Sequence, residues 1–153
     1  MATKILLVED NADNLLVLAI CLQIEGFIVG QAHDGSEAFQ KLEDETFDVV
    51  VSDIRMPGLS GFDLVGRILE RFAGVRIVLI TADPRARRMA TDNQAGVSSV
   101  LIKPFPIKEL VRAIREAVPE NDVKSVGRAQ PSYTYDQLSL ADIAIPVLDH
   151  SGL

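Results

Sequence analysis

The chain alternates between short, almost wholly apolar runs and longer segments in which apolar residues recur every three or four positions. The short runs are rich in β-branched residues and do not alternate with polar residues, which is typical of parallel strands covered on both faces. They occupy residues 5–8, 27–32, 49–53, 76–81 and 99–102. A helical segment follows each run, so five strand–helix units between residues 4 and 118 predict an α/β protein.

Residues at the ends of the helical segments support this division. The expected helices cover residues 13–25, 84–94 and 107–118, and two more follow residues 34 and 61. Asp34, followed three residues later by Glu37, has the pattern of a capping box. Asp83 before Pro84 predicts an N-cap and a first helical position. Gly26 is expected to end the first helix.

The first predicted helix carries the only cysteine of the chain. Leu15, Leu18, Ala19 and Leu22 lie on one face at helical spacing and are expected to point inward. Cys21 lies in the same apolar stretch, so we expect a buried thiol rather than a reactive one. A single cysteine cannot form an internal disulfide, which suits a reducing compartment.

Length and charge limit the class of protein. At 153 residues and 48% hydrophobic content, the chain can form one compact domain with a sizeable core. A net charge of −7 argues against binding nucleic acid through its own surface, because phosphates need a basic face. The apolar stretches are shorter than the roughly 20 residues that cross a bilayer. We therefore expect a cytoplasmic protein without membrane or nucleic-acid partners.

Charged residues follow three of the predicted strands. Glu9 and Asp10 follow the first run, Asp53 ends the third, and Lys103 follows the fifth. In open parallel sheets, ligands bind beyond the carboxyl ends of the strands. Three carboxylates and one ammonium group are therefore expected to meet at one edge of the sheet.

Such a cluster favours a divalent cation. Two like charges about 4 Å apart repel by roughly 4 kcal/mol at an effective dielectric constant near 20. Glu9, Asp10 and Asp53 would form three such pairs against a single Lys103. Oxygen ligands of this kind suit Mg²⁺ or Mn²⁺. The loop after Asp53 offers the backbone carbonyl of Arg55 as a further ligand.

A carboxylate beside Mg²⁺ and a lysine can accept a phosphoryl group. Asp53 is the expected nucleophile, because it stands alone at its strand end while Glu9 and Asp10 are paired and suited to hold the ion. Lys103 would hold one phosphoryl oxygen, and the hydroxyl of Thr81, at the end of the fourth run, could hydrogen-bond another. The product would be a reversible acyl phosphate suited to signalling.

In these motifs the chain resembles the receiver domain of two-component response regulators. The matching residues are Glu9, Asp10, Asp53, Met56, Pro57, Gly61, Thr81, Lys103, Pro104 and Phe105. The resemblance covers about residues 3–118. It implies a flavodoxin-like, doubly wound fold with a five-stranded parallel sheet in the order 2-1-3-4-5 and five helices.

The resemblance also implies a mechanism and partners. Asp53 would accept a phosphoryl group from a phosphohistidine of a sensor histidine kinase or histidine phosphotransfer protein, in an Mg²⁺-dependent reaction. Thr81 and Lys103 would stabilise the activated state, and slow self-catalysed hydrolysis would reset it. The protein would thus be a switch rather than an enzyme, acting on a downstream protein effector as a stand-alone regulator or relay intermediate, with homodimerisation left open.

One position departs from the family pattern. Receivers usually carry an aromatic residue three positions before the lysine, and here that position is Val100. A valine cannot make the large ring rotation that accompanies the movement of the threonine. We therefore expect phosphorylation to be retained and the usual relay to the face made by the fourth helix, fifth strand and fifth helix to be altered.

The domain is expected to span residues 1–118. Residues 120–135 are polar and aperiodic, as in a linker, whereas residues 136–148 regain apolar character. The part from 119 to 153 is therefore interpreted as a linker and tail. The tail is either frayed or a short helix or strand that docks onto this domain or a partner.

Two other functions compete with the switch. The first is a receiver-like scaffold that ignores phosphorylation, which the valine at position 100 favours. The second is a metal-dependent phosphatase using Asp53 as nucleophile. Haloacid-dehalogenase-type phosphatases need an aspartate two residues further on, where this chain has Arg55. No Gly-rich dinucleotide or nucleotide triphosphate motif is present.

Overall fold

The computed structural model describes residues 2–55, 61–88 and 96–118. Five parallel strands form one sheet in the order β2-β1-β3-β4-β5. The strands are β1 (Lys4–Val8), β2 (Ile28–Ala32), β3 (Val49–Asp53), β4 (Arg76–Thr81) and β5 (Val97–Ile102). The helices are α1 (Ala12–Ile24), α2 (Gly35–Asp44), α3 (Gly61–Arg71) and α5 (Ile107–Ala117). The predicted α/β fold and strand order are confirmed.

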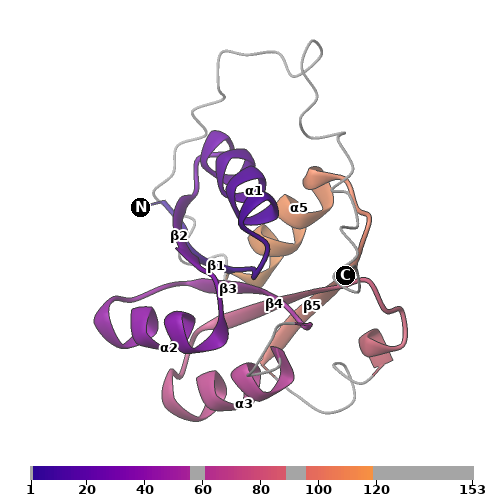
Figure 1. Ribbon diagram of the computed structural model, residues 1–153. Helices are drawn as coiled ribbons and strands as arrows, with labels where there is room; N and C mark the ends of the chain where they lie inside the picture. Colours follow the sequence, from indigo (N-terminus) through magenta and orange to yellow (C-terminus); the bar gives the residue numbers. More distant parts are fainter. Residues whose placement is uncertain (1, 56–60, 89–95, 119–153) are drawn as a thin grey trace.

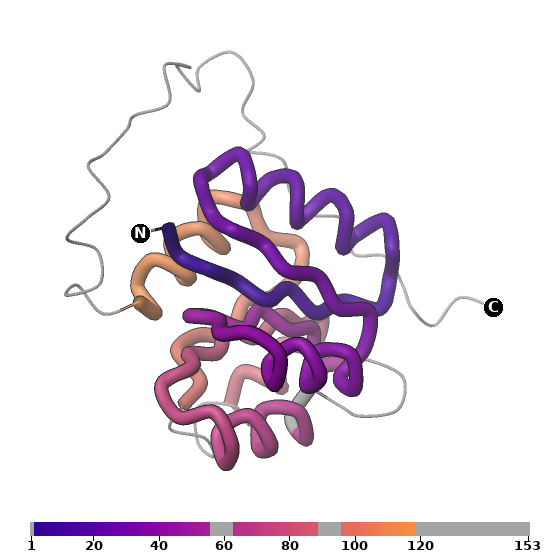
Figure 2. Tube along the Cα trace, turned by 90° about the vertical axis from the view of Figure 1, so that its left-hand side faces the viewer, coloured from indigo at the N-terminus to yellow at the C-terminus, as the bar shows by residue number. Residues whose placement is uncertain are grey.

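Helices cover both faces of the sheet. Figure 1 shows α1 and α5 on one face and α2 and α3 on the other, and the view from the side in Figure 2 shows the same two layers. Each face has its own apolar cluster, one including Leu15, Leu22 and Ile114 and the other including Leu42 and Ile68. Because β3 and most of β4 are buried on both faces, their residues need not alternate in polarity.

The helix ends follow the predicted chemistry with differences of one or two residues. Helix α1 begins at Ala12 rather than at residue 13, because the side chain of Asn11 accepts a hydrogen bond from the Asn14 amide at 3.0 Å. Asp34 caps α2 by accepting from the Glu37 amide at 2.7 Å. The Glu37 carboxylate does not complete the capping box, since it accepts from the His33 amide at 2.8 Å instead.

Three strands differ from their predicted bounds. Strand β1 begins at Lys4, one residue before the predicted run. Strand β2 begins at Ile28 rather than at Phe27, whose buried ring packs in the core. Strand β5 begins two residues before the predicted Ser99, and its pairing with β4 shifts between Val97 and Ser99. A shift of this kind marks a β-bulge, which an apolar-run criterion cannot detect.

Helix α1 is apolar on the predicted inward face and on part of its outer face. Leu15, Leu18, Ala19 and Leu22 are buried, as expected. Leu16, Val17, Ile20 and Ile24 are also apolar but 45–54% exposed. Cys21 is buried and free, so the expectation of an inert thiol is supported.

Some predictions fall outside the described residues. These are the Met56–Pro57 loop, most of the helix predicted over 84–94, and the tail from 119 to 153. Within the described part, residues 86–88 are helical and follow Asp83, whose side chain accepts a hydrogen bond from the Arg85 amide at 3.0 Å. In the same part of the chain, no helix is long and apolar enough to span a bilayer.

Candidate functional site

The strand register brings the predicted residues to one edge of the sheet. Val8 of β1 pairs with Ser52 of β3, so Glu9 and Asp53 both come one position later. Asp53 in turn pairs with Ile80 of β4, one residue before Thr81. Thr81 pairs with Ile102 of β5, immediately before Lys103. The carboxyl ends of four strands therefore supply the site, as predicted.

Lys103 links the two buried carboxylates. Its Nζ atom lies 2.6 Å from Asp53 Oδ2 and 3.5 Å from Glu9 Oε2. Exposure of the three residues is only 7%, 3% and 1%, respectively, for Lys103, Asp53 and Glu9. Charges this deeply buried are tolerated only when they are paired or coordinated. The lysine therefore balances part of an acidic cluster that would otherwise be strongly destabilising.

The pKa of Glu9 is shifted mainly by burial. Burial, opposed by the positive charge of Lys103 and reinforced by the negative charge of Asp53, raises the pKa of this carboxyl from 4.5 to about 7. For Lys103, burial acts to lower the pKa, but hydrogen bonding and attraction to the two carboxylates outweigh it and raise the pKa. The site holds more negative charge than one lysine neutralises, which is the condition that favours a cation.

Both carboxylate oxygens of Asp53 are oriented by defined partners. Oδ2 contacts the Lys103 ammonium, and Oδ1 accepts a hydrogen bond from the Arg55 amide at 2.8 Å. The Ser52 hydroxyl donates to the Asp53 backbone carbonyl at 3.0 Å. The side chain at the end of β3 is therefore fixed in place rather than free to rotate into solvent.

Thr81 lies beside this cluster and is joined to it through the backbone. The Lys103 amide donates to the Thr81 carbonyl at 2.8 Å. The Thr81 side chain is buried, and its Oγ1 accepts from the Asp83 amide at 3.0 Å. The hydroxyl proton of Thr81 can still be donated to an acceptor.

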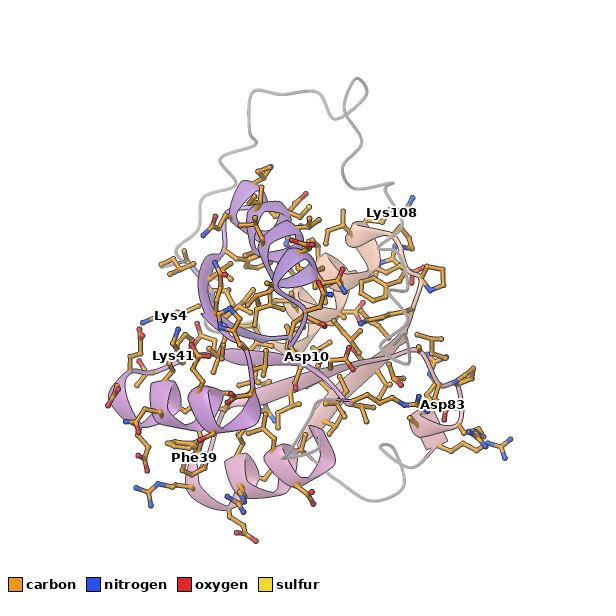
Figure 3. All side chains as sticks on the ribbon, viewed as in Figure 1. Lys4, Asp10, Phe39, Lys41, Asp83 and Lys108 are labelled. Atoms are coloured by element: carbon orange, nitrogen blue, oxygen red, sulfur yellow. The ribbon has the colours of Figure 1, made fainter. Side chains whose placement is uncertain are left out.

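Asp83, two residues after Thr81, forms ion pairs that the sequence did not indicate. Asp83 Oδ2 lies 3.0 Å from Arg85 and 3.6 Å from Arg55, and Figure 3 labels Asp83 beyond the end of β4. Hydrogen bonds from Arg85 lower the pKa of Asp83. The Arg55 pair joins the loops after β3 and β4. Sequence reasoning identified Asp83 only as a helix cap, because a contact between two loops leaves no periodic signal.

The predicted metal ligands lie at this edge, but the described residues hold no ready-made group of three or more His, Cys, Asp or Glu side chains arranged around an ion. The carboxylates of Glu9 and Asp53 contact the Lys103 ammonium. Asp10 lies between β1 and α1, where Figure 3 labels it. Mg²⁺ commonly uses one or two carboxylates and keeps several waters. The oxygen donors and the excess of negative charge fit such an ion.

Val100 occupies the position expected to be aromatic in receivers. It is 4% exposed and lies in the apolar cluster on the α2–α3 face of the sheet. Phe105, after the lysine, is 1% exposed and belongs to the cluster on the opposite face. Both residues are packing residues in this structure.

Comparisons with known proteins agree with this site. The sequence model of the response regulator receiver domain matches residues 5–115. The chain is 33% identical to the DNA-binding response regulator MtrA of Mycolicibacterium paratuberculosis over 150 residues, which is 98% of this chain and 62% of that protein. It is also 33% identical over 129 residues to the CpxR homolog of Haemophilus influenzae, covering 81% and 56%. The chain thus spans less than two thirds of these relatives.

Solved structures give the same result. A receiver domain protein from Clostridium thermocellum aligns with a TM-score of 0.72 at 26% identity, covering 80% of this chain and 98% of that one. The response regulator TrrA from Thermotoga maritima, solved in complex with Mg²⁺-BeF, aligns with a TM-score of 0.70 at 29% identity, covering 76% and 99%. With the fold, the strand-end cluster and the family match in agreement, this chain belongs to the response regulator receiver domain family, whose members act as switches in two-component signalling.

Proposed function

We propose that Asp53 is the phosphoacceptor of this receiver and takes its phosphoryl group from a phosphohistidine of a sensor histidine kinase or histidine phosphotransfer protein. The observation that carries the proposal is the 2.6 Å contact between the buried Asp53 carboxylate and the Lys103 ammonium. A carboxylate held at a strand end by a lysine and a backbone amide is oriented for in-line attack on phosphorus.

Lys103 and Thr81 would act on the transferred group. The Lys103 ammonium, already against Asp53 Oδ2, would neutralise charge on a phosphoryl oxygen. The Thr81 hydroxyl would donate its proton to another oxygen, turning away from the Asp83 amide that it now accepts from. Movement of Thr81 would disturb the loop after β4, which carries the Asp83 ion pairs.

Glu9, Asp10, the Asp53 carboxylate and the backbone carbonyl of Arg55 would hold Mg²⁺, or Mn²⁺ in its place. The donor set is all oxygen. Burial, together with the negative charge of Asp53, raises the pKa of Glu9 to about 7, and a bound dication would stabilise the ionised carboxylate. When bound, such an ion supplies charge neutralisation for the phosphoryl oxygens. TrrA, a receiver of the same fold, was solved with Mg²⁺-BeF, which supports the same choice of ion here.

The output proposed for this chain is a change in protein–protein contact. A scaffold that ignores phosphorylation is the second candidate, because Val100 replaces the aromatic residue of the usual relay. The match to MtrA continues over 150 residues and so past the receiver, and MtrA is a DNA-binding regulator. A pull-down with and without beryllofluoride separates switch from scaffold, since only a switch changes its partners.

Acetyl phosphate and Mg²⁺ provide a direct test on the full chain. Intact-mass measurement should show one added phosphoryl group on the wild type and none on Asp53→Asn. Asp44→Asn, which changes an exposed carboxylate of α2, is the matched control and should be modified like the wild type. Chelation with EDTA should prevent the modification. A phosphoryl group added to Asp53→Asn would disprove the assignment.

A further inference from the structure

The outer face of α1 carries an apolar stripe made of Leu16, Val17, Ile20 and Ile24. Leu16, Ile20 and Ile24 follow one another at intervals of four, so they form a single row along the helix. Each of the four is 45–54% exposed. Continuous apolar surface of this kind marks an interaction site more often than isolated exposed residues do.

A groove lies at the carboxyl end of this stripe, between α1 and α5. It has a volume of about 640 Å³ and is lined by Glu25, Lys108, Val111, Arg112, Arg115, Glu116 and Val118. Figure 3 labels Lys108 on α5, on the same side of the sheet as α1. Arg115 lies 3.6 Å from Glu25 and 5.8 Å from the Phe27 ring centre. Three basic and two acidic side chains give the groove a positive excess.

We propose that residues 136–149 of this same chain cover the α1 stripe and the edge of the α5 groove. The segment contains six large aliphatic residues and three aspartates but no lysine or arginine. The aliphatic residues match the stripe, and the aspartates match the basic side of the groove. Docking of this segment does not depend on the chemistry at Asp53.

The point where the chain leaves the domain favours this occupant over a second copy. Val118 is the last described residue, and it lines the groove together with Glu25, the C-cap of α1. Helix α1 has 13 residues and so is about 20 Å long. The segment is separated from Val118 by 17 residues, and a flexible chain of that length spans about 23 Å on average. Tethering at this distance gives residues 136–149 a high effective concentration at the α1 stripe.

The test uses paramagnetic relaxation in the full chain. Cys21→Ala removes the only native thiol, and Ser139→Cys places a spin label within the segment. Docking predicts strong broadening of the Ile20 and Ile24 methyl signals. Substituting Leu140→Ser together with Ile143→Ser should lower the docked-to-undocked ratio by about a hundredfold, because each lost aliphatic contact contributes roughly tenfold or more.

Two further arms complete the design. Ile20→Ser, on the helix surface, should reduce broadening at Ile24, whereas the linker substitution Val126→Ser should leave it unchanged. Mixing spin-labelled chains with methyl-labelled chains that carry no spin label detects contact between copies. Absence of broadening, or broadening in the mixed sample as strong as in the doubly labelled sample after allowing for dilution of the label, would overturn the proposal. Either result would leave the acetyl phosphate test of Asp53 unaffected.

Discussion

Substituting Glu9→Gln should stabilise the metal-free protein at neutral and alkaline pH. Glutamine resembles the protonated carboxyl in shape but cannot ionise, so it removes the cost of burying a charge at this position, together with the attraction to Lys103 and the repulsion from Asp53. The pKa of Glu9 rises from 4.5 to about 7 on folding. Each pH unit between the two values contributes about 1.4 kcal/mol, so ionised Glu9 lowers the free energy of unfolding by about 3 kcal/mol above pH 7.

The direction of the pH dependence follows from proton binding. Between pH 4.5 and 7, the native state keeps a proton on Glu9 that the unfolded chain has released. The free energy of unfolding therefore falls as the pH rises through this window and levels off above it. Because Glu9→Gln leaves the other titratable groups in place, the difference between wild type and variant isolates this carboxyl.

Urea denaturation followed by circular dichroism, in EDTA at pH 5, 6, 7 and 8, measures the difference. We expect the difference between wild type and Glu9→Gln to stay below about 1 kcal/mol at pH 5 and to reach about 3 kcal/mol at pH 8. Exposed Glu70→Gln is the control and should follow the wild type. Adding Mg²⁺ should raise wild-type stability at pH 8 more than that of the variant. A constant difference across the pH range would refute the reasoning.

Four other substitutions test the charge, packing and capping arguments. Lys103→Met leaves two buried carboxylates without their cation, and should lower the free energy of unfolding by about 3–5 kcal/mol in urea denaturation. Gly96→Ala would place a Cβ 2.0 Å from Leu69 Cδ2 and should destabilise by about 1–3 kcal/mol, whereas Gly66→Ala meets open space within α3 and should stabilise by about 0.5–1 kcal/mol. Equal effects of the two glycine substitutions would contradict the packing argument. Asp34→Ala removes the N-cap of α2, and an unfolding free energy lowered by about 1 kcal/mol is expected.

The order of the elements was predictable because each strand is a short apolar run that ends in turn residues. Strands β3 and β4 were predicted with their observed bounds, since charged or polar residues stand at both ends. The convergence of Glu9, Asp53 and Lys103 was also predictable, because parallel strands place their carboxyl ends at one edge. The 2-1-3-4-5 order came from the family resemblance and not from any run of residues.

Other features depend on three-dimensional contacts that no local pattern encodes. The inward face of α1 was predicted from its helical spacing. Residue type alone, however, does not distinguish a buried apolar residue from an exposed one such as Leu16 or Ile20. The Arg55–Asp83 ion pair joins two loops 28 positions apart. The shift in the pKa of Glu9 depends on burial and on the position of Lys103, and both require coordinates.

The contacts of Lys103 have a consequence for biosynthesis. This lysine lies 50 positions after Asp53 and still further after Glu9, and it follows β5, the last strand along the described part of the chain. A nascent chain that ends before residue 103 therefore lacks the only cation found against both carboxylates in the described residues. Domains emerge from the ribosome amino terminus first. Until β5 is added, the carboxylates of Glu9 and Asp53 would therefore either stay exposed to solvent or be buried without Lys103. On the proposed function, a product truncated before residue 103 would lack the cation that orients Asp53 and would not compete for the phosphoryl donor.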